Sequence, residues 1–424
     1  MEPRSVLGVE EINLSDFLFW SRPLEEREGA FATLRRERPI SFHEEPYLEG
    51  LPFPRGPGYW ALTKYADILE VSRSPELFCS GQGSNIGDLP PDFAEFFGSM
   101  INMDDPRHAR LRRIVSRGFT PRMIQRVEED VQRSATQIVD DVIDRGTCDF
   151  VTDIAAALPL KIICDMMGIP QSQFKFIFDR TNVILGAGDP EYVSNPLEVV
   201  PALLQSGAEL SQLVQELGRE RVAHPTDDLT SALVNAEIEG ERLTEQELGS
   251  FFVLLVVAGN ETTRNAISHG MKALCDYPEQ RRRWAADFEG LAPTAVDEIV
   301  RWATPVIHFR RTATRDTELR GQKIGAGQKV VLWYCSGNRD EDVFPDPFRF
   351  DVTRTPNEHV GFGGPGPHFC LGAHLARREI TVMFREIFRR LPDLRIVGEP
   401  ARLQSFFIHG IKHMQCEFKA GGAG

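Results

Sequence analysis

Residues Phe362–Glu379, FGGPGPHFCLGAHLARRE, contain the most informative motif of the sequence. A lone cysteine, Cys370, lies in a loop with four glycines and two prolines, directly ahead of a predicted helix. Glycines let the backbone approach another group closely and turn N–H groups toward the sulfur, and the dipole at a helix N-terminus favours a thiolate. A thiolate in such a loop is either a nucleophile or a metal ligand.

Three chemical interpretations of Cys370 compete with a structural one. A catalytic nucleophile needs a histidine base, and His368 and His374 are near in sequence. A zinc ligand needs three further Cys or His donors at close spacing, and those two histidines are too few. An axial haem ligand needs no other protein ligand, because the porphyrin supplies four nitrogens. Most cysteines are simply structural, and the glycine-rich loop argues against that role here.

The helix predicted after Cys370 carries a wide apolar stripe at helical spacing. Its members are Leu375, Ala376, Ile380, Met383, Phe384, Ile387, Phe388 and Leu391. Such a stripe must be buried, so it anchors the preceding loop to the protein core.

A second long helix is predicted from Glu245 to Asp276. Thr244 and Glu247 form a capping box at its start, and "FFVLLVVA" makes its first half apolar almost all round. Its middle nevertheless reads AGNETT. Gly259 lowers helix propensity by about 1 kcal/mol relative to alanine, and Glu261 is costly to bury unless it is paired or protonated. A buried helix that accepts both costs indicates a functional site.

Composition narrows the class of protein. The chain has 424 residues, 42% of them hydrophobic, and a net charge of -14, which argues against nucleic acid as the main partner. Its seven cysteines are scattered without a CxxC pair, as suits a reducing compartment. The start lacks a signal peptide, and the longest apolar run is too short to span a bilayer. We therefore expect a cytoplasmic protein without a membrane span, and a monomer by default.

The pattern along the chain predicts a mainly α protein with a minor β-sheet region. We expect a single domain, 1–424, because no repeat, low-complexity tract or linker divides the chain. It comprises a β-rich N-terminal part at about 30–80, a helical body at about 106–293, and a mixed C-terminal part that contains the loop 361–372.

Four motifs in order resemble those of the cytochromes P450. Gly366, His368, Cys370 and Gly372 are similar to the haem-thiolate loop of that family. AGNET (258–262) resembles its oxygen-activating helix kink, EIVR (298–301) its Glu-x-x-Arg pair, and NRD with FPDPFRFD (338–351) its meander. The aromatic residue usually found seven positions before the cysteine is replaced by Gly363, and Phe362 comes one position earlier. The resemblance implies the cytochrome P450 fold.

The resemblance also implies site residues. Cys370 would be the axial iron ligand of haem b (iron protoporphyrin IX), and Glu261 and Thr262 would pass protons to bound oxygen beside Gly259. The further haem contacts implied, the first four of them to its propionates, are His108, Arg112, Arg311, His368, Phe362 and Gly372. The alternative for "RHARLRR" is a solvated basic face, and for Thr262 a hydrogen bond back to a carbonyl. Glu298 and Arg301 would form a buried structural ion pair.

The resemblance implies a monooxygenase that inserts one oxygen atom of O2 and releases the other as water. "LPLKIICDMMGIP" and "LLVVAGNETTRNAISHGM" resemble actinobacterial P450s that hydroxylate methyl-branched lipids, which predicts terminal (omega) hydroxylation of a branched lipid or isoprenoid chain. A sterol side-chain or terpene hydroxylase is the alternative, and a haem sensor or carrier without turnover is the alternative from another class. The Glu261–Thr262 pair argues against the sensor.

The pocket and the electron donor follow from the same resemblance. By analogy the pocket is lined by stretches poor in charge, which predicts an apolar substrate. These stretches are Gly81–Met103, Thr181–Pro201, Pro305–Phe309 and Phe406–Ile411. No flavin or Fe–S motif is present in the sequence, so electrons must come from a ferredoxin with its reductase. Its expected contacts are Arg112, Arg113, Arg377 and Arg378.

Overall fold

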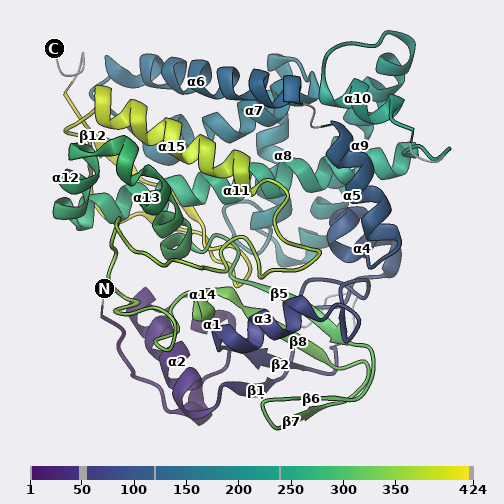
Figure 1. Ribbon diagram of the computed structural model, residues 1–424, viewed down its shortest axis with the longest axis vertical. Coiled ribbons are helices and arrows are strands. Elements are labelled where there is room, and N and C mark those ends of the chain that lie inside the picture. Colours follow the sequence, from purple (N-terminus) through teal and green to yellow (C-terminus); the bar gives the residue numbers. More distant parts are fainter. Residues whose placement is uncertain (1, 47–54, 119–120, 238–239, 420–424) are drawn as a thin grey trace.

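A computed structural model describes residues 2–46, 55–118, 121–237 and 240–419. Helices make up one large part of the molecule, and a smaller part holds the main sheet (Figure 1). The helices are α1 (Phe17–Trp20), α2 (Leu24–Glu37), α3 (Tyr65–Arg73), α4 (Pro91–Gly98), α5 (Arg107–Gly118), α6 (Pro121–Ile143), α7 (Ala157–Met167), α8 (Phe174–Gly186), α9 (Val199–Ala223), α10 (Leu229–Asn235), α11 (Glu245–Asp276), α12 (Pro278–Ala286), α13 (Phe288–Ala303), α14 (Tyr334–Gly337) and α15 (Ala373–Arg390). The prediction of a mainly α protein with a minor sheet is confirmed.

The main sheet joins segments from both ends of the chain. The strands are β1 (Ile40–His43), β2 (Tyr59–Leu62), β3 (Phe78–Cys79), β4 (Thr147–Asp149), β5 (His308–Ala313), β6 (Thr317–Leu319), β7 (Gln322–Ile324), β8 (Lys329–Trp333), β9 (Arg395–Ile396), β10 (Ala401–Arg402), β11 (Ile411–His413) and β12 (Gln415–Glu417). Five of them form the order β1-β2-β8-β5-β3, in which β2 and β8 are parallel. The segment 30–80 therefore contributes three strands to this sheet, together with α3.

Alternation along β8 gives the sheet two buried faces. Val331 and Trp333 belong to one apolar cluster with α2, whereas Val330 and Leu332 belong to a second cluster with α3. Successive side chains of a strand point to opposite faces, so a strand such as β8, which is apolar from Val330 to Trp333, is expected where both faces are covered. A third and larger cluster fills the helical part around α11.

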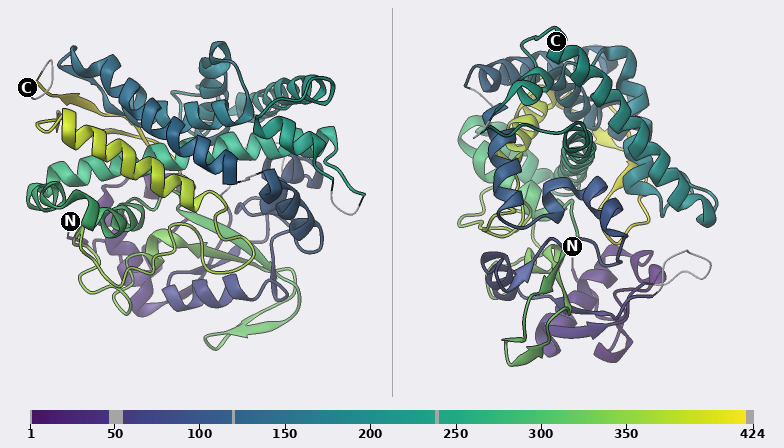
Figure 2. Two further views of the ribbon diagram at one scale, coloured as in Figure 1. Left: turned by 45° about the horizontal axis from the view of Figure 1, so that its top comes forward. Right: turned by 90° about the vertical axis from the view of Figure 1, so that its right-hand side faces the viewer.

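The long helix predicted at 245–276 has the predicted bounds and is continuous across 258–262, where the family resemblance implies a kink, and the helix predicted after Cys370 is present. α11 runs without interruption from Glu245 to Asp276, with the capping box of Thr244 and Glu247 in place. α15 begins three residues after Cys370 and packs on α6 and α11, as two further views show (Figure 2). Most of its apolar stripe is buried as expected, and Leu375, Ala376 and Phe388 are half-buried. Among the described residues, none of the helices combines the length and the hydrophobicity of a membrane span.

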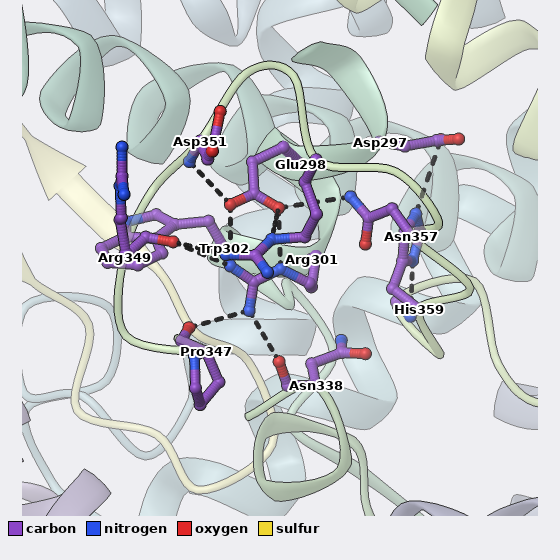
Figure 3. A network of polar contacts seen from close by, with 12 residues as sticks. Asp297, Glu298, Arg301, Trp302, Asn338, Pro347, Arg349, Asp351, Asn357 and His359 are labelled. Atoms are coloured by element: carbon purple, nitrogen blue, oxygen red, sulfur yellow. Dashed lines mark hydrogen bonds and ion pairs between the residues drawn. The ribbon is translucent and has the colours of Figure 1, made fainter. Parts of the chain in front are cut away.

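A buried ion pair within α13 binds the segment that leads toward Cys370 through further hydrogen bonds (Figure 3). Arg301 donates to both carboxylate oxygens of Glu298, at 2.7 and 2.8 Å, and both side chains are fully buried. The guanidinium also donates to the carbonyls of Asn338 and Pro347, while Glu298 accepts the N–H of Asp351. The predicted structural pair is thus confirmed, and its spare hydrogen-bonding capacity holds the meander.

Replacing Arg301 by alanine should destabilise the protein by about 3–5 kcal/mol, because the fully buried Glu298 would lose both hydrogen bonds from the Arg301 guanidinium and keep only Arg354 as an ion-pair partner. Urea unfolding of the purified protein, together with the soluble yield, measures the effect. Arg385→Ala is the matched control, since its pair with Glu289 is largely exposed and should contribute at most about 1 kcal/mol. Equal losses in the two variants would contradict this account.

Candidate haem-binding cavity

One cavity of about 630 Å³ lies between α11 on one side and the Cys370 loop on the other. The residues predicted for the site that line it are Thr262, Gly259, His108, Arg112, Arg311, Phe362, His368, Gly372 and Cys370. They come from α5, α11, β5 and the loop before α15. The fold therefore brings together segments more than 250 residues apart, and Glu261 is the member of the predicted set that is not among the described lining residues.

Cys370 lies on the cavity wall at the start of α15. Its side chain keeps exposed surface there, while the surrounding protein shields it from bulk water. Burial raises the pKa of the Cys370 thiol, whereas the backbone N–H groups of Gly372 and Ala373 and the charge of Arg112 oppose that rise. The N–H groups predicted to face the sulfur are thus partly identified. A bound metal cation would supply the remaining stabilisation that a thiolate needs.

Two of the loop glycines serve close packing rather than the sulfur. A Cβ on Gly366 would lie 2.2 Å from the carbonyl oxygen of Ser72 in α3, and one on Gly364 would lie 2.5 Å from the Ser72 hydroxyl. Gly364 and Gly366 therefore make the close backbone approach expected of the loop glycines, and the group that they approach is α3. The loop needs them because it presses against α3.

The shifted aromatic residue has a structural role at the start of the loop. The Phe362 carbonyl accepts the Cys370 N–H at 3.0 Å, and the guanidinium of Arg377 lies 4.5 Å from the centre of the Phe362 ring. Gly363 follows with φ +83°, a conformation that favours glycine. Phe362 still lines the cavity, and we infer that the turn at Gly363 compensates for its shift by one position in the sequence.

Basic groups gather at one edge of the cavity. The rings of His108 and His368 lie 4.3 Å apart between centroids, and Arg112 and Arg311 stand near them, donating to the carbonyls of Phe369 and Arg310. Burial, followed by the charge of Arg311, lowers the pKa of His368 to about 3. His108 Nε2 is buried and has no hydrogen-bond partner in the described part of the chain. An anionic group at this edge would relieve the crowding of positive charge.

These residues fit an iron porphyrin. The cavity offers one thiol on its wall, a basic edge with an unpartnered imidazole nitrogen for carboxylates, and apolar walls for the ring. The zinc alternative lacks a ligand set, since no three His, Cys, Asp or Glu side chains gather for a metal among the described residues. A catalytic nucleophile that uses His368 as its base is also disfavoured. The His368 ring lies against His108, and burial together with the charge of Arg311 keeps the pKa of His368 too low for a base.

Thr262 and Gly259 lie on the cavity face of α11. The Thr262 hydroxyl donates to the Ala258 carbonyl at 2.6 Å, which is the hydrogen bond back to the helix considered as its alternative role. A Cβ on Gly259 would lie 2.5 Å from Ile163 Cδ1 of α7. Gly259 therefore permits α7 to approach α11 closely, a reason that the sequence did not reveal.

Glu261 faces away from the cavity. Its Oε1 accepts from Arg264 one turn along α11 and from Asn265 Nδ2 at 3.2 Å, and both Glu261 and Arg264 are buried. Arg264 also donates to Asn182 of α8 at 2.9 Å. Glu261 Oε2 has no hydrogen-bond partner among the described side chains. The cost of burying this carboxylate is thus offset by an ion pair within its own helix.

The apolar wall differs in part from the predicted stretches. Of these, 81–103 contributes Met100 and Ile101, and 305–309 contributes Pro305, Val306 and Phe309. The stretches Thr181–Pro201 and Phe406–Ile411 supply none of the described lining residues, because α8 packs on α9 and α11 and the 406–407 rings pack behind His308 and Phe309. The sequence missed part of the wall instead, namely Ile163, Met166, Phe251, Leu254 and Leu255.

A buried carboxyl group on the cavity wall was also missed. Glu379 of α15 is almost completely inaccessible, and burial raises its pKa to about 8 in spite of a hydrogen bond with Thr263. Its Oε1 has no partner in the described structure. Glu379 lies four residues from both Leu375 and Met383, so its position within the apolar stripe was a signal that could have identified it.

The chain matches the family model "Cytochrome P450" over residues 291–392. It is 54% identical to a protein of Mycobacterium tuberculosis named methyl-branched lipid omega-hydroxylase, over 97% of this chain and 95% of that protein. It is 42% identical to a steroid C26-monooxygenase of Mycolicibacterium smegmatis, over 94% of this chain and 91% of that protein.

Among solved structures, the chain is similar to a cytochrome P450 of Mycobacterium marinum in complex with pseudoionone. The TM-score is 0.92 and the sequence identity 45%, and the match covers 98% of this chain and all of that one.

Glu379→Gln should weaken the pH dependence of stability. Because the pKa of Glu379 is raised to about 8, the folded state retains a proton that the unfolded state releases above the ordinary glutamate pKa of 4.5. Stability is therefore lost as pH rises through this window, and a neutral glutamine removes that loss. Thermal unfolding of both proteins from about pH 5 to about pH 8.5 measures the difference. Parallel profiles would show that Glu379 is not protonated in the folded state.

Proposed function

Because the chain belongs to the cytochrome P450 family of haem-thiolate monooxygenases, we propose that it hydroxylates the terminal (omega) carbon of a methyl-branched lipid or isoprenoid chain. The observation that carries this proposal is the 54% identity, over nearly the whole length, to a methyl-branched lipid omega-hydroxylase. The cavity wall agrees with it. Side chains such as Met100, Leu254 and Val306 offer an aliphatic chain an apolar surface with few polar groups.

In this proposal the protein holds haem b through Cys370 and through the basic edge of His108, Arg112, Arg311 and His368. When bound, the haem-thiolate iron activates O2, of which one atom enters the substrate and the other leaves as water. The residues of the protein position the substrate, exclude water and handle protons. The apolar wall favours an aliphatic chain over water at the reacting end, since its carbon surface gains most from burial there.

Thr262 and Glu261 are the proton-handling pair in this proposal. The Thr262 hydroxyl lies on the cavity wall and can exchange its bond to the Ala258 carbonyl for a bond to a bound molecule. Glu261 lies next to it in the chain but faces away from the cavity, with Oε2 unpartnered among the described side chains and Oε1 held by Arg264. Its side chain would have to turn toward the cavity to exchange a proton there. A carboxyl group with one restrained and one unpartnered oxygen suits the uptake and release of a proton.

A sterol side chain is the second candidate substrate. The 42% identity to a steroid C26-monooxygenase favours it, and the volume and apolar lining of the cavity do not discriminate against it. The higher identity to the lipid hydroxylase places the branched lipid first. A terpene belongs to the same group of apolar alternatives.

We also propose that residues 1–424 act as one cytoplasmic domain, monomeric, and reduced by a ferredoxin. Support for one domain comes from the main sheet, which combines strands from both ends of the chain. Support for the docking of ferredoxin comes from Phe369 and Leu371, which are exposed on either side of Cys370, and from Arg113, which follows Arg112 in α5 and is also exposed. Arg112 and Arg377 are engaged with the loop itself, through the Phe369 carbonyl and the Phe362 ring.

A binding screen followed by product analysis tests the substrate. Methyl-branched acyl chains should shift the haem absorbance at low micromolar concentration and yield omega-hydroxylated product with ferredoxin, its reductase and NADPH. Cholestenone and small terpenoids should bind more weakly. Tight binding by the sterol alone would overturn the ranking, and binding without any oxidised product would favour a haem sensor.

Two variants accompany this screen: Cys370→Ser tests the role of the thiolate, and Cys275→Ser is its matched control. Cys370→Ser should lose thiolate-ligated haem and product formation, because a serine hydroxyl does not ionise readily as a ligand. Cys275 is half-buried and is not among the described residues that line the cavity, so its variant should behave as the wild type.

Arg113→Glu should slow reduction by ferredoxin several-fold, and the loss should shrink at high salt because ionic screening weakens attraction between exposed charges. Stopped-flow reduction at two ionic strengths measures the effect. Arg395→Glu, in β9 beyond the C-terminal end of α15, is the control: Arg395 is also exposed, and this variant should be reduced at the wild-type rate. Unchanged kinetics for Arg113→Glu would count against docking at this surface.

A further inference from the structure

Two cysteines far apart in the chain meet in the small sheet formed by β4, β12 and β9. Cys148 of β4 and Cys416 of β12 are paired directly opposite each other in antiparallel register. Their sulfur atoms lie 3.4 Å apart, and both residues are buried. Opposite residues in antiparallel strands have Cα atoms about 4.5–5.5 Å apart, within the range of about 4.4–6.8 Å that a disulfide requires.

The remaining cysteines are placed differently. Cys370 lies on the wall of the haem-binding cavity, while Cys79, Cys164, Cys275 and Cys335 are at separate positions in the molecule. Among the described residues, no second pair of sulfur atoms is in contact. The sequence shows no CxxC motif, and the pairing arises because β12 returns to β4 across 268 positions of the chain.

We propose that Cys148 and Cys416 are an oxidative cross-linking site, which hydrogen peroxide converts to a disulfide that ties β12 to β4. One thiolate attacks the peroxide, the O–O bond breaks, and a sulfenic acid and water form. The second thiol then displaces the sulfenic oxygen as a second water, giving one S–S bond for one peroxide consumed. The two electrons lost by the sulfurs reduce the peroxide, and two thiol reductant equivalents reverse the reaction.

The surroundings of the two thiols make this reaction slow while β4 is paired with β12. The neighbouring Cys148 thiol and burial raise the pKa of Cys416, so that little thiolate is present. β4 is, however, a three-residue strand at the edge of its sheet, and short edge strands open at low free-energy cost. Opening of β4 exposes the thiols to peroxide, and closing returns the sulfurs to contact for the second step.

The cross-link would restrain the C-terminal segment that backs the cavity. From β12 the chain runs back to Ile411, whose N–H donates to Asn265 of α11 at 2.9 Å, and to His409, which bonds the Ala303 carbonyl at 2.6 Å. Ile408 pairs with Val306, a residue of the cavity wall. A disulfide that closes so long a loop also restricts the unfolded chain, so the oxidised protein should be the more stable form.

The test uses the haem-loaded protein, reduced and then treated with hydrogen peroxide until catalase stops the reaction. After denaturation with a thiol-alkylating reagent, the oxidised chain should take up five labels instead of the seven that its cysteines allow. Peptide mapping should find the 148–416 cross-link, and reduction should restore all the labels. The midpoint temperature of thermal unfolding should rise by several degrees on oxidation.

Cys148→Ala and Cys416→Ala should each abolish the cross-link and the thermal shift, whereas Cys275→Ala should retain both. Two single variants are used because one of them can fail to fold. The same treatment is repeated in urea below the unfolding transition, where opening of β4 is more frequent. Seven labels under both conditions, or a cross-link that joins another pair, would overturn the proposal. None of these measurements depends on the substrate, so the outcome is independent of the proposed hydroxylation.

Discussion

The ion pair between Glu298 and Arg301 holds the part of the structure on which the cavity depends. Removing two charges from water is costly, and the cost is recovered here because nearly every donor and acceptor of the pair is used. Those bonds extend to Asn338, whose side-chain oxygen accepts the N–H of Val360. The pair therefore determines where the loop that carries Cys370 begins.

α11 shows how a buried helix can contain polar chemistry. Thr262 lines the cavity, while Glu261 does not and is paired with Arg264 on the same helix. Arg264 also bonds Asn182 of α8, so the position of the acid depends on the packing of a neighbouring helix. The helix remains continuous because its polar side chains find partners that do not interrupt the backbone hydrogen bonds.

Much of the site could be predicted where the relevant spacing is local. His108 and Arg112 lie four residues apart on one helix, and both reach the cavity as their spacing indicates. The bounds of α11 followed from its capping box and apolar pattern. The packing role of Gly259 could not be predicted, because it depends on how closely Ile163 of α7 approaches α11. Two of the four predicted wall stretches failed for the same reason, since packing decides which face of a segment meets the cavity.

The helical class, the loop around Cys370 and the ion pair of Glu298 and Arg301 could be predicted from the sequence, because each depends on residues that are close together in the chain. Only the tertiary structure decided that Glu261 turns away from the cavity, that Glu379 is a buried acid on its wall, and that Cys148 meets Cys416. These facts depend on contacts between segments far apart in the chain. Such contacts are set by the packing of whole helices and strands, which local spacing does not specify.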